Sequence, residues 1–294
     1  MTETVTASTA VLFLDEEEAA EPALAGNKAA TLARLSASGL PVPPGFVVTV
    51  AACDRITAAG EGGAIDQDLL AAIRSGLARL GDTALAVRSS GTAEDREDAS
   101  YAGQYETVLG VRGPGEVAAA LRTCVASAAA ARVRAYAGDG AGLARMAVLV
   151  QRLVPADAAG VAFTANPVTG DPEILVSAVR GLGERLVSGE VTPDEWVVRG
   201  GEVTCLNSIE DAIDTGQAGR VAELARHVAE LAGTPQDVEW AVAGDDLWLL
   251  QARPITALPV PPRIEPPADG YWEKDGAHYP APMTRSAPRC TCPP

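Results

Sequence analysis

The residues best suited to chemistry lie late in the chain, in two apolar runs that flank a short Gly/Asp turn. The runs Val238–Val242 and Leu247–Ala252 predict two strands joined as a hairpin. With a three-residue loop, Glu239 lies directly opposite Gln251, and Arg253 continues the same face. The predicted neighbours on that face are apolar: Ala241, Leu247 and Leu249.

A carboxylate, an amide and a guanidinium on one otherwise apolar face need a partner, because burying such groups alone is costly. A divalent metal on Glu239 and Gln251, with a phosphate on Arg253, would satisfy all three. A plain Glu–Arg ion pair on a half-exposed hairpin accounts for the same residues. The hairpin alone leaves both interpretations open.

A second candidate is Arg88, which stands near the end of a predicted strand and before a long polar loop, residues 90–103. Short hydroxyl side chains and glycines let backbone N–H groups approach an anion, and a guanidinium can fork onto phosphate oxygens. The opposing hypothesis is an ordinary surface loop, which the four acidic residues of the loop favour. Loops of this length inside a compact domain are uncommon without a function.

Two further side chains have a functional and a plain interpretation. Lys28 follows Gly26 and Asn27 at the start of a predicted helix, where it would either contact a phosphate or lie solvated in a first turn. Gln151 lies inside an apolar strand, where an amide beside backbone groups suits an adenine ring. Its plain alternative is an edge strand with Gln151 pointing to solvent.

Composition restricts the class of protein. Of the 294 residues 47% are hydrophobic but only 4% aromatic, so the core is expected to be built from Ala, Val and Leu, as suits an α/β protein. The net charge of −16 argues against nucleic acid or an anionic membrane as partner. No apolar run is long enough to span a membrane and no signal peptide is evident. Five mostly scattered cysteines predict a reducing cytoplasm.

Hydrophobic periodicity predicts alternating helices and strands up to residue 256 and a linker with five prolines after it. The predicted organisation is a domain at 1–258, followed at 259–294 by a Pro-rich linker and the start of another domain. The expected helices are Asn27–Ser38, Asp66–Leu80, Glu116–Ala137 and Gly219–Ala232. The expected strands, besides the hairpin, are Phe46–Val50, Ala84–Ser89, Tyr105–Val111, Met146–Val154, Gly160–Thr164, Ile174–Ala178 and Glu195–Val198.

The order of the short motifs along the chain is more specific than any one of them. They run GNKAATLARL, GLPVPPGFVVT, VRSSGTAED, AGQYET, AGVAFTANPVTG, GLGERLVSG, DVEW and QARPIT. This series resembles the ATP-binding domain of the phosphoenolpyruvate synthase / pyruvate phosphate dikinase family, which rifampicin phosphotransferases share. The resemblance covers roughly residues 10–258.

The resemblance implies a two-lobed ATP-grasp-like fold, with ATP and Mg²⁺ as cofactors between two α/β lobes. Matched by motif, the residues that would contact phosphates are Lys28, Arg88 and Arg253. Gly103 and Thr107 would belong to the loop that covers the phosphates. Gln151 and the backbone near Leu153 would hold adenine, and Glu239 and Gln251 would take magnesium.

The family's chemistry splits ATP to AMP and phosphate and passes the β-phosphoryl group to a histidine, then to pyruvate or an antibiotic hydroxyl. Two features depart from the family. The phosphate loop reads EDREDAS where Leu-Pro is usual after Glu-Asp, and neither His227 nor His278 lies in a phospho-carrier motif. The expected partner is therefore a histidine domain supplied by another chain or missing from this one. The alternative function is a non-catalytic or degenerate ATP-binding regulatory module.

Overall fold

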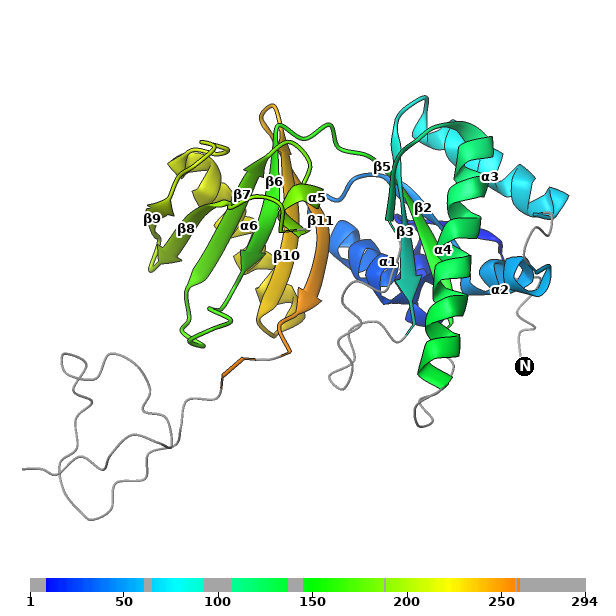
Figure 1. Ribbon diagram of the computed structural model, residues 1–294, viewed down its shortest axis with the longest axis horizontal. Helices are drawn as coiled ribbons and strands as arrows, with labels where there is room; N and C mark the ends of the chain where they lie inside the picture. Colours follow the sequence, from blue (N-terminus) through cyan, green and yellow to red (C-terminus); the bar gives the residue numbers. More distant parts are fainter. Residues whose placement is uncertain are drawn as a thin grey trace, which may run out of the picture.

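The computed structural model describes residues 9–60, 65–92, 107–136, 145–187, 189–256 and 258–259 (Figure 1). These residues form two antiparallel sheets, each with its own helices, and helix α1 lies between the two sheets. We call each sheet with its helices a lobe. The expected α/β class with two lobes is confirmed.

The first lobe is built on a five-stranded sheet of order β1-β2-β5-β3-β4. The strands are β1 Val11–Phe13, β2 Gly45–Val48, β3 Leu85–Gly91, β4 Thr107–Val111 and β5 Met146–Arg152. The helices are α1 Pro22–Ala37, α2 Val50–Ala58, α3 Gln67–Leu80 and α4 Gly113–Tyr136, and a short 3-10 helix spans Glu17–Ala20. One face of the sheet packs on α1 and the other on α2, α3 and α4, so both faces are apolar.

The second lobe is built on a six-stranded sheet of order β11-β10-β6-β7-β8-β9. The strands are β6 Ala158–Phe163, β7 Ile174–Arg180, β8 Asp194–Arg199, β9 Glu202–Asn207, β10 Gln236–Ala243 and β11 Asp246–Pro254; the helices are α5 Glu184–Val187 and α6 Thr215–Ala232. Helix α6 begins with a capping box between Asp214 and Gln217 and ends at Gly233 in the left-handed conformation. Its apolar stripe covers one face of the sheet.

One apolar core joins the two lobes. Helix α1 packs its buried side, which includes Leu32, against the first sheet and against β11 of the second, which contributes Leu249 to the same core. The backbone N–H of Leu249 also donates to the carbonyl of Pro41, at 2.9 Å. This packing holds the two sheets next to each other, so that residues of both sheets can form one site.

The predicted helices and strands are present in the described residues, with shifted ends, and five elements were not expected, one of them the 3-10 helix Glu17–Ala20. Val50 opens α2 instead of ending a strand, because the hydroxyl of Thr49 accepts from the N–H of Ala52 and caps the helix. Strands β1 and β9 and helix α5 were also missed. The boundary predicted at 258/259 falls at the end of the described residues, and 260–294 lie outside them.

Candidate functional site

The hairpin β10–β11 pairs Glu239 with Gln251, as the sequence predicts, but a β-bulge produces this pairing instead of the length of the loop. The strands are joined by the two residues Gly244 and Asp245, whereas a three-residue loop was expected. A β-bulge restores the register, because Leu250 is an extra residue between the pairs Glu239–Gln251 and Trp240–Leu249.

The bulge also changes which apolar residues share the face of Glu239. Leu249 lies opposite Trp240 and Leu247 opposite Val242, and all four side chains turn into the core beneath α6 and α1. The expectation that Leu247 and Leu249 accompany Glu239 is therefore wrong, because the extra residue reverses the alternation between Leu249 and Gln251. The face of Glu239 carries Ala241, Asp237, Gln251 and Arg253 and is turned away from α6.

Arg88 of β3 reaches across to this hairpin and connects the two lobes. Its Nη2 donates to Oε2 of Glu239 at 2.7 Å and to Oε1 of Gln251 at 2.8 Å, and its Nη1 donates to the carbonyl of Leu250 at 2.8 Å. The Leu250 carbonyl belongs to the bulged residue. One guanidinium thus holds a carboxylate, an amide oxygen and a backbone oxygen at one point, and its side chain is only 13% exposed.

The carboxylate of Glu239 is surrounded by positive charge. Burial by itself raises the pKa of Glu239, but the charges of Arg88 and Lys28, the hydrogen bond from Arg88 and the charge of Arg253 outweigh it. The pKa of Glu239 is therefore held below its ordinary value. Glu239 remains ionised at neutral pH, which is the form that a cation requires.

A second carboxylate of the site, Asp237, was missed by the sequence reasoning. Asp237 lies opposite Arg253 across the hairpin and accepts a hydrogen bond from Nε of Arg253 at 2.8 Å, and Nη2 of Arg253 forms an ion pair with the same oxygen at 2.7 Å. Burial raises the pKa of Asp237, Arg253 pulls that pKa down and Glu239 adds to the rise, so the pKa of Asp237 lies above its ordinary value. Its other oxygen, Oδ1, has no hydrogen-bond partner among the described residues.

Lys28 is brought to the site by a break in α1. Gly26 has φ 73° and ψ 164°, so the regular part of the helix starts at Asn27. A Cβ on Gly26 would lie 2.1 Å from the carbonyl oxygen of Ser90, and the hydroxyl of Ser90 accepts from the N–H of Ala29 at 3.1 Å. Ser90 is two residues beyond Arg88, so the start of the helix is fixed beside the end of β3.

The remaining predicted residues of the site lie near β3, with one exception. Thr107, exposed at the start of β4, pairs directly with Arg88. Gln151 lies in β5 between β2 and β3, is buried, and donates to the carbonyl of Pro43 at 2.8 Å, so the edge-strand alternative is wrong. The N–H of Leu153 donates to the carbonyl of Ala84 at 2.9 Å. Gly103 lies outside the described residues.

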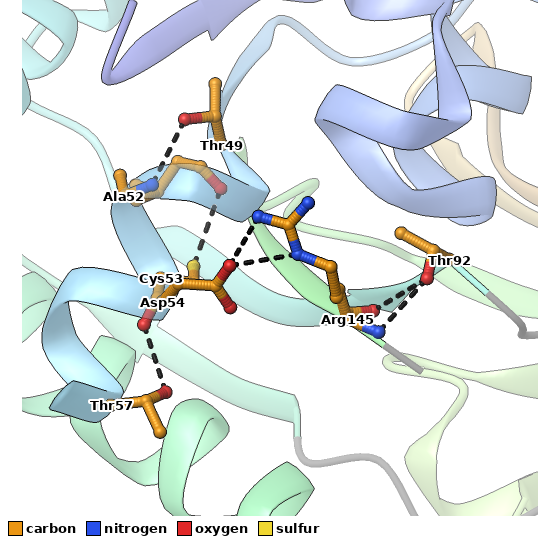
Figure 2. Close-up of polar contacts among 8 residues, drawn as sticks. Thr49, Ala52, Cys53, Asp54, Thr57, Thr92 and Arg145 are labelled. Atoms are coloured by element: carbon orange, nitrogen blue, oxygen red, sulfur yellow. Dashed lines mark hydrogen bonds and ion pairs between the residues drawn. The ribbon is translucent and has the colours of Figure 1, made fainter. Parts of the chain in front are cut away.

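The end of the strand that carries Arg88 is anchored to the rest of the first lobe (Figure 2). Thr92 and Arg145 exchange hydrogen bonds through the Thr92 hydroxyl and the Arg145 backbone, both at 3.1 Å. The guanidinium of Arg145 in turn pairs with Asp54 on α2, with Nε donating at 2.9 Å. These contacts therefore hold Thr92, just after the end of β3, to Arg145 and through it to α2.

The donor set of the site fits a hard divalent cation. Glu239 Oε2 and Gln251 Oε1 converge on one nitrogen, and carboxylate and amide oxygens are ligands that Mg²⁺ accepts. No group of three or more His, Cys, Asp or Glu that suits a metal occurs in the described part of the chain. A cation at Glu239 and Gln251 would therefore need further oxygens, which the phosphates of a nucleotide can supply.

A hollow of about 740 Å³ lies elsewhere, between α6 and the strands β7 to β9. Its charged lining residues are Glu223, Arg226 and Glu230, which already pair with one another along α6. Because α6 covers the face opposite to Glu239, this hollow is separate from the cluster around Arg88.

The family model "Pyruvate phosphate dikinase, AMP/ATP-binding domain" matches residues 61–211 and 202–264 of this chain. The chain belongs to this family. The match includes Arg88 and both strands of the hairpin, β10 and β11. The contacts of Arg88 with Glu239 and Gln251 therefore lie within the matched domain.

Several curated proteins share this domain. The prodigiosin synthesizing transferase PigC of Serratia marcescens is 38% identical over 91% of this chain and 35% of its own length. A probable phosphoenolpyruvate synthase of Methanothermobacter thermautotrophicus is 33% identical over 84% of this chain and 46% of its own length. A rifampicin phosphotransferase of Streptomyces sviceus is 36% identical over 85% and 36%. The chain thus spans between about a third and a half of these relatives.

Proposed function

We propose that this chain binds ATP between its two lobes and activates it for phosphoryl transfer, as the nucleotide-binding module of a dikinase-type phosphotransferase. The observation that carries the proposal is the meeting of Arg88 from the first lobe with Glu239 and Gln251 from the second, beside Lys28 and Arg253. Three cations and an oxygen pair at one place, in a chain of this family, suit a polyphosphate with a divalent metal.

The proposed individual roles are those that the family resemblance implies, and each is compatible with the chemistry of the side chain. Lys28, Arg88 and Arg253 neutralise the phosphates, and Thr107 and Gly103 contribute to the cover over them. Gln151 and the backbone near Leu153 border the adenine. Glu239 and Gln251 hold magnesium, which when bound spreads positive charge over the phosphate oxygens. Asp237 orients Arg253 through a hydrogen bond from Nε and an ion pair with Nη2.

The proposed reaction cleaves ATP to AMP and phosphate and passes the β-phosphoryl group to a histidine, then to pyruvate or to a hydroxyl compound such as an antibiotic. Two of the relatives, a probable phosphoenolpyruvate synthase and a rifampicin phosphotransferase, support this choice of acceptors. The one histidine among the described residues, His227, is on α6, which covers the opposite face of the second sheet. Because neither His227 nor His278 lies in a phospho-carrier motif, the proposed receiving histidine belongs to a separate domain or chain.

Two measurements test the proposal on the full chain. Calorimetry with ATP and Mg²⁺ should show one binding event, weakened strongly by Glu239→Gln and unchanged by Arg226→Met on α6. A folded chain that gives no heat would refute ATP binding. Adding a separately produced histidine domain of this family should then yield AMP. ATP binding without AMP under those conditions would point to the alternative, a non-catalytic or degenerate regulatory module.

A further inference from the structure

The structure shows the guanidinium of Arg88 at the point where the magnesium ligands meet. Nη2 of Arg88 lies 2.7 Å from Glu239 Oε2 and 2.8 Å from Gln251 Oε1. Magnesium binds its oxygens at about 2.0–2.1 Å. A cation on these two oxygens and this orientation of Arg88 therefore exclude each other, both by space and by charge repulsion.

We propose that Arg88 guards the metal ligands: it occupies Glu239 and Gln251 until the β- and γ-phosphates of a nucleotide draw it away, so that divalent metal enters only together with a polyphosphate. This inference rests on the proposed function and names how that site selects its ligand. The ligand class is a nucleotide that carries at least a diphosphate, and neither free metal nor a nucleoside satisfies it.

The first argument is that Arg88 is well held and does not lose its charge. Its guanidinium makes three hydrogen bonds, to Glu239, Gln251 and the Leu250 carbonyl, and its side chain is 13% exposed. An arginine stays protonated at any working pH, so no proton loss releases it. Release requires another anion, and phosphate is the anion that a guanidinium forks onto best.

The second argument is charge balance around Glu239. This carboxylate forms an ion pair with Arg88, whose Nη2 lies 2.7 Å from Oε2 of Glu239. If Arg88 moved to a phosphate with nothing in its place, a carboxylate whose side chain is only 31% exposed would lose its ion-pair partner, which is unfavourable. If a metal approached first, Arg88 would lose its own partners without a replacement. Arg88 leaving and metal arriving are thus favourable together and unfavourable separately.

Such an exchange makes metal and polyphosphate binding reciprocally cooperative. Coupling between two ligands is typically about 5- to 150-fold in affinity. The guanidinium is the element with two positions, on the oxygens of the hairpin or on the phosphates. The arrangement would keep the site from filling with metal alone.

The test uses Mn²⁺ as the probe, read by the loss of its free electron paramagnetic resonance signal, on the full chain without nucleotide. Arg88→Met should bind Mn²⁺ at least about tenfold more tightly than the unchanged chain, within the usual range of such couplings. Arg88→Met combined with Glu239→Gln should lose that gain. Arg226→Met, which removes an arginine with two ion pairs on α6, should behave as the unchanged chain. Equal Mn²⁺ affinity with and without Arg88 would overturn the proposal.

A second measurement does not depend on the folding of a variant. In the unchanged chain with nitrogen-15-labelled arginine and a chelator present, the Arg88 Nε signal should shift on addition of ADP or ATP and stay in place with adenosine. A shift with adenosine, or none with bound ATP, would overturn the proposal. Failure of ATP to bind at all would instead refute the proposed function, while the nucleotide-free Mn²⁺ comparison would still decide the role of Arg88.

Discussion

At the scale of single residues, the two carboxylates of the hairpin differ in what their charge contributes. Glu239 and Asp237 lie two positions apart on one face, yet the pKa of Glu239 is lowered and that of Asp237 is raised. The difference comes from their partners, because Glu239 has three cations near it whereas Asp237 has Arg253 on one oxygen and no partner on the other.

These opposite shifts predict opposite effects of pH on stability. The stabilisation from ionised Glu239 is present above its unfolded pKa, near 4.5, and is lost as pH falls through the lowered folded value. Ionised Asp237 instead costs stability, and that cost grows as pH rises above 3.8 through its raised folded value. We therefore expect the free energy of unfolding of Asp237→Asn, measured in urea, to rise relative to that of the unchanged chain as the pH increases from about 4 to about 7. A constant difference across this range would contradict the raised pKa.

Arg253 provides a test of hydrogen-bond geometry. Its Nε and Nη2 both meet one oxygen of Asp237, so the plane of its guanidinium is fixed and its remaining donors are aimed away from that carboxylate. Arg253→Lys keeps the charge but loses the fork, and we expect AMP formation to fall by at least about 100-fold, or about 2.7 kcal/mol of barrier. Near-normal AMP formation by the lysine variant, with ATP affinity measured in parallel, would show that a point charge suffices.

At the scale of elements, the break at Gly26 positions Lys28, and glycine is required there for two reasons. Gly26 has φ 73°, and its Cβ would overlap the carbonyl of Ser90. Gly39 has φ 83° but open space around its Cβ, which makes it a matched control. Gly39→Ala should cost about 1–2 kcal/mol of unfolding free energy from backbone strain alone, whereas Gly26→Ala should cost clearly more and weaken ATP binding. Equal losses in urea unfolding would mean that the contact with Ser90 carries no weight.

The sequence predicted elements well where one face is apolar, and poorly where neither face is. The alternation in the hairpin and the stripe of α6 were readable because burial selects those residues. Strand β9 was missed because most of its residues, Glu202–Asn207, are exposed and leave no hydrophobic pattern. The bulge at Leu250 was not specified either, since an extra residue in a strand has no pattern of its own.

The members of the site were predicted only in part. Motif order along the chain placed Lys28, Arg88, Glu239 and Gln251 in one site, and the structure brings them together. Asp237 precedes the predicted strand and was overlooked, although the two-residue period from Glu239 was a signal for it. That Arg88 itself fills the oxygen pair could not be read from the sequence, because it depends on a contact between residues 151 positions apart.

At the scale of the whole molecule, the two lobes share one core, and this predicts that they unfold together. Helix α1 packs against both sheets, and Arg88 and the Leu249–Pro41 hydrogen bond add polar links. No helix in the described residues is long and apolar enough to cross a membrane. A core cluster that contains residues of both lobes favours a single cooperative transition.

The tryptophans make this cooperativity measurable. Those among the described residues, Trp196, Trp240 and Trp248, all belong to the second sheet, whereas α1 to α4 of the first lobe provide most of the helix. With Trp272, which lies outside the described residues, replaced by Phe, fluorescence follows the second lobe and far-ultraviolet circular dichroism mainly follows the first. Trp240 is fully buried in the core cluster that the two lobes share, so Trp240→Ala should cost about 3–5 kcal/mol and shift both signals equally in urea. The exposed control Val168→Ala should change stability by less than about 0.5 kcal/mol. If only the midpoint of the fluorescence transition shifted to a lower urea concentration, the lobes would be separate folding units. The polar links through Arg88 would then be too weak to couple them.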